Sequence, residues 1–213
     1  MTAAPRRLSS AEAEAFAAIS AADPDVAAFV GRAGPYGPRE GDGDSFASLA
    51  RAIVFQQLAG RAAAAIHGRF VAAIGGRVTP DAILATSPED LRAAGLSGNK
   101  TLSLIDLATK VQDGTVPLDG IDALADDDIV ERLTTVRGIG RWTAEMFLLF
   151  QLRRPDVWPV DDLGVRFGWS LIHALPETIK PKALQAEGDR FRPYRSTLAL
   201  LCWHAVHVER GQA

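Results

Sequence analysis

The stretch Leu133-Thr-Thr-Val-Arg-Gly-Ile-Gly-Arg-Trp-Thr-Ala144 is the part of the chain that decides its fold. Apolar residues at helical spacing precede and follow it, and the Gly-Ile-Gly at its centre separates the two predicted helices. Gly138 and Gly140 can adopt positive φ and allow another backbone to approach closely. Ile139 would pack the two helices together, while the N–H groups that begin the second helix would face outward and suit a phosphate. The pattern predicts a tight helical hairpin, and a plain turn between two helices is the alternative.

Helical patterns also fill the chain on both sides of this hairpin. Ser9 and Glu12 have the spacing of a capping box, and Asp44 directly precedes apolar residues spaced three and four apart. Glycine- and proline-rich sequence between Gly31 and Gly43 predicts a loop. No run of residues makes a convincing strand, so the predicted fold class is all-α. Helices are predicted at about 9–20, 26–32, from 45, 60–74, from 79, from 87, 100–112, from 126, 142–152, from 161, 182–190 and 195–208.

Composition is that of an ordinary soluble globular protein of 213 residues, with 47% hydrophobic and 23% charged residues. No apolar run reaches the roughly 18 residues that a membrane span needs, and no signal peptide is predicted, so a cytoplasmic location is expected. The net charge of −3 lacks the basic excess usual in nucleic-acid-binding proteins. Backbone N–H groups at helix N-termini, with a few local Arg or Lys side chains, can nevertheless hold phosphates.

The hairpin sequence resembles that of the helix-hairpin-helix (HhH-GPD) DNA glycosylase superfamily, most closely 3-methyladenine DNA glycosylase II of the AlkA/Mag type. In that family an essential aspartate follows the hairpin after about twenty residues, and here Asp162 lies 20 residues after Trp142 (162 − 142). Two further segments are similar, Ile53-Val-Phe-Gln-Gln57 and Phe191-Arg-Pro-Tyr-Arg-Ser196. The resemblance therefore covers most of the chain.

Two adjacent aspartates stand at the predicted start of a helix, where either could be an N-cap. The family pattern places the catalytic residue second in such a pair, directly before the segment that here begins with Leu163. The resemblance therefore implies that Asp162 is the catalytic carboxylate and that Asp161 caps or supports the helix. A carboxylate near C1′ stabilises the positive charge that develops on deoxyribose as an N-glycosidic bond breaks. It can also orient or deprotonate the attacking water.

Aromatic side chains are the candidates for recognising the damaged base. An alkylated, cationic purine favours aromatic faces through stacking and cation–π attraction. The resemblance implies that Trp142 and Trp203 line the base pocket, with Phe55 and Tyr194 as further candidates, and core packing is the alternative for each. In bifunctional members of the family a lysine that forms a Schiff base with C1′ takes the place of Trp142. The tryptophan there predicts base excision without strand cleavage.

Contacts with DNA are expected from two regions. The target base must be flipped out of the duplex, and a side chain must fill the gap. The resemblance implies that Leu58 is this wedge and that Gln57 reads the opposite strand, whereas a core leucine is the alternative for Leu58. Phosphate contacts are expected from the hairpin residues Gly138, Gly140, Arg141 and Thr143.

The resemblance also implies a monovalent cation, Na⁺ or K⁺, on the main-chain carbonyls of Thr134, Val136 and Ile139. This ion would be structural, and no cofactor is required for the chemistry. The single cysteine, Cys202, leaves no ligand set for an iron–sulfur cluster. The implied architecture is two helical lobes with a DNA-binding cleft between them. One lobe spans residues 45–160 and carries the hairpin, and the other combines residues 1–44 with 161–213 and carries the catalytic aspartate at the lobe junction.

The expected activity is that of a monofunctional DNA glycosylase, acting as a monomer on damaged bases in double-stranded DNA. It would flip out alkylated purines such as 3-methyladenine and hydrolyse their N-glycosidic bond in base excision repair. Two alternatives remain. A bifunctional glycosylase/lyase for other damaged bases is disfavoured by Trp142 and by the lack of iron–sulfur cysteines. A non-catalytic hairpin module that only binds DNA is disfavoured by Asp162 and the aromatic pair, because simple binding requires neither.

Overall fold

The computed structural model describes residues 8–34, 36 and 44–211, and every regular element in these ranges is helical. The all-α prediction is therefore confirmed. Most of the predicted loop Gly31–Gly43 lies outside the described residues. None of the described helices combines the length and the apolar character that crossing a bilayer would require.

Contacts divide the chain into two compact units. Unit 1 consists of the described residues within Met1–Glu40 and Arg153–Ala213, and unit 2 is Gly41–Leu152. The sequence predicts slightly different limits, with one lobe at residues 45–160 and the other at residues 1–44 and 161–213. The segment between Arg153 and Val160 has its contacts in unit 1 because Pro155 and Val157 hydrogen-bond to Ser196 there.

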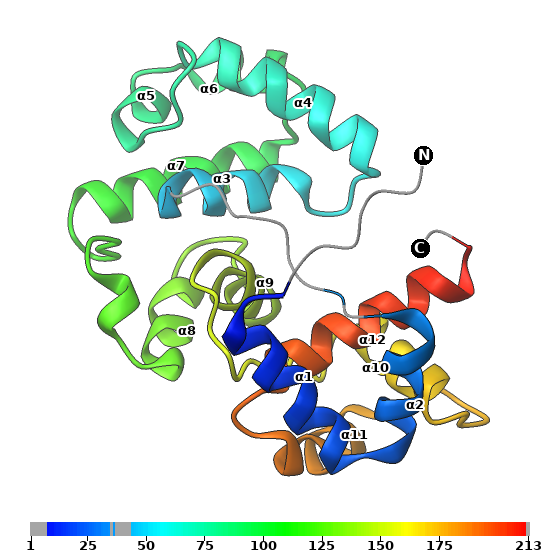
Figure 1. Ribbon diagram of the computed structural model, residues 1–213. Helices are drawn as coiled ribbons and strands as arrows, with labels where there is room; N and C mark the ends of the chain where they lie inside the picture. The colour runs from blue at the N-terminus through cyan, green and yellow to red at the C-terminus, as the bar shows by residue number, and fades with distance from the viewer. Residues whose placement is uncertain (1–7, 35, 37–43, 212–213) are drawn as a thin grey trace. The chain divides into compact units, whose positions relative to one another are not determined.

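Unit 2 is built around three helices whose apolar faces meet. Leu49 and Ile53 of α3, Leu104 and Leu107 of α7, and Phe70 of α4 are fully buried. The short helices α5 and α6 pack on α7, and α8 leads into the hairpin (Figure 1). The elements of unit 2 are α3 (Ser45–Phe55), α4 (Gly60–Ala73), α5 (Pro80–Leu84), α6 (Pro88–Ala93), α7 (Gly98–Gln112), η1 (Ile121–Ala123), α8 (Asp126–Thr134), α9 (Arg141–Met146) and η2 (Phe147–Gln151).

Unit 1 is built on the packing of α10 against α12, with α1 and α2 beside them (Figure 1). Gly168 of α10 meets the backbone of α12 at Cys202, where a Cβ would lie 2.8 Å from the Cys202 Cα. Leu198 and Leu201 of α12 are fully buried. The elements of unit 1 are α1 (Ser10–Ala22), α2 (Pro24–Ala33), α10 (Leu163–Ile172), α11 (Pro181–Gly188), η3 (Asp189–Phe191) and α12 (Arg195–Glu209).

Helix starts follow the capping signals of the sequence, with one correction. The capping box at Ser9 is formed, and Asp44 caps α3 through the N–H of Ala47. The predicted cap at Asp161 is wrong. Because α10 begins at Leu163, the preceding residue Asp162 is its N-cap, and its side chain accepts the N–H of Val165.

Candidate active site and DNA-binding hairpin

The hairpin predicted from the sequence joins α8 to α9 in unit 2. Gly138 has a φ of 76°, and Gly140 is the N-cap residue of α9. A Cβ at Gly138 would lie 2.5 Å from Oγ of Ser103 on α7, so both the conformation and the available space require glycine. The side chain of Ile139 is buried, at 3% exposure, as its predicted role in packing the helices requires.

Gln56 connects this hairpin to α3. It is the C-cap residue of α3, and its Nε2 donates to the Gly138 carbonyl at 2.9 Å. The same nitrogen lies 3.5 Å from Oγ1 of Thr143 in α9. One amide therefore contacts the hairpin loop and the helix that follows it.

Asp106 on α7 holds the hairpin from another side. Its Oδ2 accepts the backbone N–H of Arg137 at 2.7 Å and the ammonium of Lys110 at 2.9 Å. Lys110 also donates to the carbonyl of Thr135, just after the end of α8. Burial by itself raises the pKa of Asp106, but the hydrogen bonds from Arg137 and Lys110 outweigh it and lower this pKa. The carboxylate therefore stays charged and keeps both contacts at neutral pH.

The turn between α3 and α4 carries the predicted wedge, Leu58, and the predicted reader of the opposite strand, Gln57, and both are exposed. Gln57 has a φ of 56°, and Leu58 is 38% exposed. Lys100 of α7 donates from Nζ to the carbonyls of Val54 and Gln56, each at 2.8 Å, and so caps the end of α3. Burial lowers the pKa of this lysine. The backbone that precedes the wedge is thus tied to α7 by Lys100 and to the hairpin by Gln56.

Two aromatic candidates for the base pocket lie in unit 2 and differ in their surroundings. Trp142, in the first turn of α9, is 46% exposed. The half-buried ring of Phe55 is covered on one face by Arg51, whose Cζ is 3.8 Å from the ring centroid, and it forms a T-shaped pair with His67. Burial and the charge of Arg51 lower the pKa of His67, which favours the neutral ring at physiological pH. Trp142 therefore presents more accessible aromatic surface than Phe55.

Asp162 and Trp203 meet in unit 1. Oδ1 of Asp162 accepts the backbone N–H of Val165 at 2.8 Å and the indole N–H of Trp203, on α12, at 2.9 Å. Both side chains are half-buried, whereas Asp161 is exposed. The structure therefore fixes the predicted catalytic carboxylate with one donor from its own helix and one from the neighbouring helix.

Two residues at the start of α12 bind the segment 154–157, which precedes Asp162 in the chain. The guanidinium of Arg195 pairs with both oxygens of Asp156 through Nε at 2.7 Å and NH2 at 2.8 Å, and this side chain is 8% exposed. Ser196 accepts the N–H of Val157 at 2.9 Å and donates to the carbonyl of Arg154 at 2.6 Å. Phe191–Ser196 is one of the segments that resemble the glycosylase family, and these contacts give it a structural role that its sequence did not reveal.

Tyr194 and Cys202 are also placed in unit 1. Tyr194, a predicted base-pocket residue, donates its hydroxyl to Glu14 at 2.7 Å, and this hydrogen bond raises the pKa of the phenol. Burial, aided by the nearby charge of Asp162, raises the pKa of the Cys202 thiol far above its ordinary range. Cys202 is therefore a buried thiol and no nucleophile.

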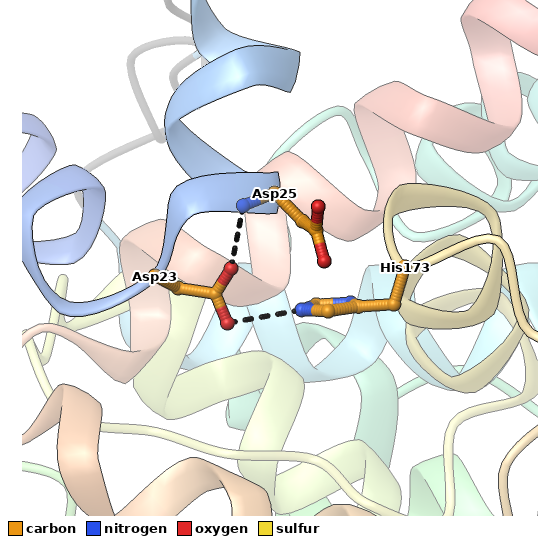
Figure 2. Close-up of side chains that lie close together, drawn as sticks. All are labelled: Asp23, Asp25 and His173. Carbon is orange, nitrogen blue, oxygen red and sulfur yellow. Dashed lines mark hydrogen bonds and ion pairs between the residues drawn. The ribbon is translucent and has the colours of Figure 1, made fainter.

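A second polar cluster, formed by Asp23, Asp25 and His173, lies in unit 1 (Figure 2). Oδ2 of Asp23 is 3.1 Å from Nε2 of His173 and accepts from Arg190 at 2.6 Å. Nδ1 of His173 faces the carbonyl of Trp169 at 2.9 Å, so both ring contacts are hydrogen bonds only when the ring is protonated. A metal ion at Asp23 would have to displace the guanidinium of Arg190. We therefore assign the cluster to ion pairing that stabilises the fold.

Residues 50–193 match the family model of the HhH-GPD superfamily base excision DNA repair proteins. The chain belongs to the HhH-GPD superfamily. Its match to DNA-3-methyladenine glycosylase 1 of Schizosaccharomyces pombe is 36% identical over 163 residues, 75% of this chain and 72% of that protein. The matched segments span 58% and 46% of two further curated relatives.

Solved structures of HhH-GPD proteins share this fold. The S. pombe 3-methyladenine DNA glycosylase Mag1, in complex with abasic DNA, has a TM-score of 0.80 at 34% identity, covering 89% of this chain and 95% of that chain. The DNA-3-methyladenine glycosidase of Bacillus halodurans has a TM-score of 0.84 at 32% identity, covering 97% and 95%. These values confirm the family inferred from the hairpin and the spacing to Asp162.

The predicted site residues thus form two groups. Asp162, Trp203 and Tyr194 belong to unit 1, with Asp162 and Trp203 in direct contact. Unit 2 holds the hairpin, the wedge turn, Trp142 and Phe55. The sequence did not assign roles to five residues that hold these parts in place, namely Gln56, Asp106, Asp156, Arg195 and Ser196.

Proposed function

We propose that this HhH-GPD protein is a monofunctional DNA glycosylase that hydrolyses the N-glycosidic bond of alkylated purines, such as 3-methyladenine, in base excision repair. It acts as a cytoplasmic monomer on double-stranded DNA. Relatives named DNA-3-methyladenine glycosylase, and the complex of one such protein with abasic DNA, support this assignment. The observation that carries it is the carboxylate of Asp162, held at the start of α10 by two N–H donors.

The reaction places positive charge on the deoxyribose as the base departs, so a fixed anion near C1′ lowers the barrier. The Asp162 carboxylate provides this charge and orients the attacking water. An alkylated purine is already cationic and leaves readily, so the chemistry does not require a general acid. Trp142 in unit 2 and Trp203 in unit 1 are each proposed to contact the base, and Phe55 and Tyr194 are secondary candidates.

Binding of the DNA backbone is assigned to the hairpin. Gly138, Gly140 and Thr143 offer N–H groups where α9 begins, and Arg141 is 64% exposed at the same place, with Nε 3.0 Å from Glu145. Exposed Leu58 is the proposed wedge, and Gln57 is its partner on the opposite strand.

A monovalent cation in the hairpin is part of the proposal. Thr134 is the last residue of α8, and Val136 and Ile139 lie in the turn that leads to α9. The main-chain carbonyl oxygens of these three residues are the ligand type that Na⁺ and K⁺ take. Such an ion, when bound, supplies positive charge beside a DNA phosphate. No step of base release passes through it.

The test is base release from duplexes carrying 3-methyladenine, 7-methylguanine, ethenoadenine or hypoxanthine. We expect the protein to release at least the alkylated bases and to leave alkali-labile abasic sites, with no strand cleavage and no adduct trapped by borohydride. Asp162→Asn should abolish release and retain binding, because the Asn carbonyl can still accept from Val165 and Trp203 while its charge is gone. Asp161→Asn is the matched control. Loss of release in Asp161→Asn alone would overturn the assignment.

A further inference from the structure

The indole N–H of Trp203 is directed at the reacting carboxylate rather than at a backbone carbonyl. It donates to Oδ1 of Asp162 at 2.9 Å, and the same oxygen accepts the N–H of Val165 at 2.8 Å. A carboxylate that is held at one oxygen by donors from two different helices cannot rotate freely about its last torsion. The two donors together therefore set the direction of the second oxygen.

Gly164, the second residue of α10, leaves the space that this contact needs. A Cβ at this position would lie 2.7 Å from Cδ1 and 2.8 Å from Nε1 of Trp203, and 3.1 Å from Oδ1 of Asp162. These distances are shorter than ordinary contacts of a Cβ, so any larger residue would displace the indole, the carboxylate or both. Gly164 has a negative φ, so the available space, and not the backbone conformation, is what requires glycine.

The support beneath Trp203 is rigid. The neighbouring residue Cys202 is fully buried, and its backbone packs against Gly168 of α10 without an intervening side chain. At the start of the same helix, Arg195 and Ser196 hold the segment that precedes Asp162. Helix α12 therefore contacts this part of the chain at two places, residues 154–157 through Arg195 and Ser196, and Asp162 through Trp203.

We infer that Trp203 is a positioning residue for the Asp162 carboxylate, and that its N–H group, rather than its aromatic face, is what the reaction depends on. This inference rests on the proposed function and changes the role first assigned to Trp203, which was a wall of the base pocket. An aromatic wall and a positioning donor make different demands on the side chain. A wall requires only a ring, whereas a positioning donor requires the N–H.

Trp203→Phe separates the two roles because it keeps a ring and removes the donor. Hydrogen bonds to charged groups are strong enough that we expect single-turnover base release to fall by about 10- to 100-fold. The fall should be the same for cationic 7-methylguanine and for any neutral base that the parent releases, since the carboxylate acts on the sugar. The Kd for a duplex with a tetrahydrofuran abasic analogue should stay within about threefold of the parent value.

Trp158→Phe is the matched control. It also removes an indole N–H from a buried hydrogen bond in unit 1, in this case the 3.0 Å bond to the carbonyl of Leu184. Any loss of stability should therefore be similar, while base release should stay within about twofold of the parent rate. Equal losses in Trp158→Phe and Trp203→Phe would show a general structural effect and overturn the inference.

Gly164→Ala gives a second variant that retains the whole tryptophan. Its added methyl pushes the indole off the carboxylate, so release should fall as in Trp203→Phe, and the double variant should lose little more than either single variant. Parental release in Trp203→Phe, or a loss confined to cationic bases, would identify a stacking wall and overturn the inference. Asp162→Asn in the same assay distinguishes the failures. If Asp162→Asn still releases bases, the catalytic role of Asp162 is wrong, whereas a parent protein that releases no base would overturn the proposed function itself.

Discussion

The close approach of α10 and α12 leads to a prediction for Gly168→Ala. A Cβ at Gly168 would lie 2.8 Å from the Cα of Cys202 and closer still to its carbonyl, whereas ordinary contacts of a Cβ begin near 3.4 Å. The helices must then separate by more than 0.6 Å (3.4 − 2.8), because the carbonyl carbon and oxygen of Cys202 lie closer to the Cβ than its Cα does. Because the obstructing atoms are backbone atoms, no side-chain rotation can relieve the clash.

Overpacking of this kind costs up to about 3 kcal/mol. Alanine recovers about 1 kcal/mol through its better helix propensity, so the expected net loss in the free energy of unfolding is about 2 kcal/mol. For a chain of this size that loss lowers Tm by about 4–8 °C. A similar shift between Trp203 and Asp162 would lengthen their 2.9 Å hydrogen bond to about 3.5 Å, beyond the usual range. Base release should therefore fall by about tenfold.

Thermal unfolding followed by circular dichroism, together with single-turnover base release, measures both effects. Gly68→Ala in α4 is the matched control, because its helical glycine has nothing within 4 Å of the added Cβ. The Tm of this control should stay the same or rise, because alanine adds up to about 1 kcal/mol to the free energy of unfolding. If Gly168→Ala also melts at or above the parent Tm, the account of the α10–α12 contact is refuted.

Three further changes test the contacts that support the site. Asp23→Asn should lower the free energy of unfolding by about 2 kcal/mol at neutral pH. Burial raises the pKa of Asp23, but the hydrogen bonds from His173 and from backbone N–H groups lower it overall. The stability that Asp23 contributes should therefore be present above about pH 4 and be lost as the pH falls through the lowered pKa. The urea midpoints of parent and variant should converge in acid. Gln56→Ala should weaken binding to an abasic duplex, measured by fluorescence anisotropy, and should lower the free energy of unfolding by about 1 kcal/mol. Unchanged affinity would contradict the inference that Gln56 supports the hairpin. Arg195→Lys loses the bidentate pairing with Asp156 and should lower stability by about 1–2 kcal/mol, and an unchanged urea midpoint would show that the pair contributes nothing.

Helix positions could be predicted from the sequence because caps and periodicity are local signals. Ser9 and Asp44 cap the helices that follow them, as expected. The helix around Lys100 begins earlier than predicted, at Gly98, because Ser97 supplies its cap. The helix that leaves the hairpin changes to a π-helix over Phe147–Gln151, for which apolar periodicity gives no signal.

Site residues could be predicted only as far as family spacing identifies them. The spacing located Asp162, but it does not encode contacts between residues far apart in sequence. The bond from Gln56 to Gly138 joins positions 82 residues apart, and the bond from Trp203 to Asp162 joins positions 41 residues apart. Such pairs depend on helix packing, which no local pattern specifies.

The assignment of capping and catalysis to different aspartates was the most informative error. A residue that caps a helix is usually regarded as structural, which is why Asp161 was expected to cap and Asp162 to react. In the structure Asp162 is the cap, and the proposed function makes the same residue the catalytic carboxylate. The N–H of Val165, in the first turn of α10, orients its carboxylate. Electrostatic catalysis requires an anion that is already in place before charge develops on the substrate. A helix cap, completed by Trp203 from α12, provides such an anion.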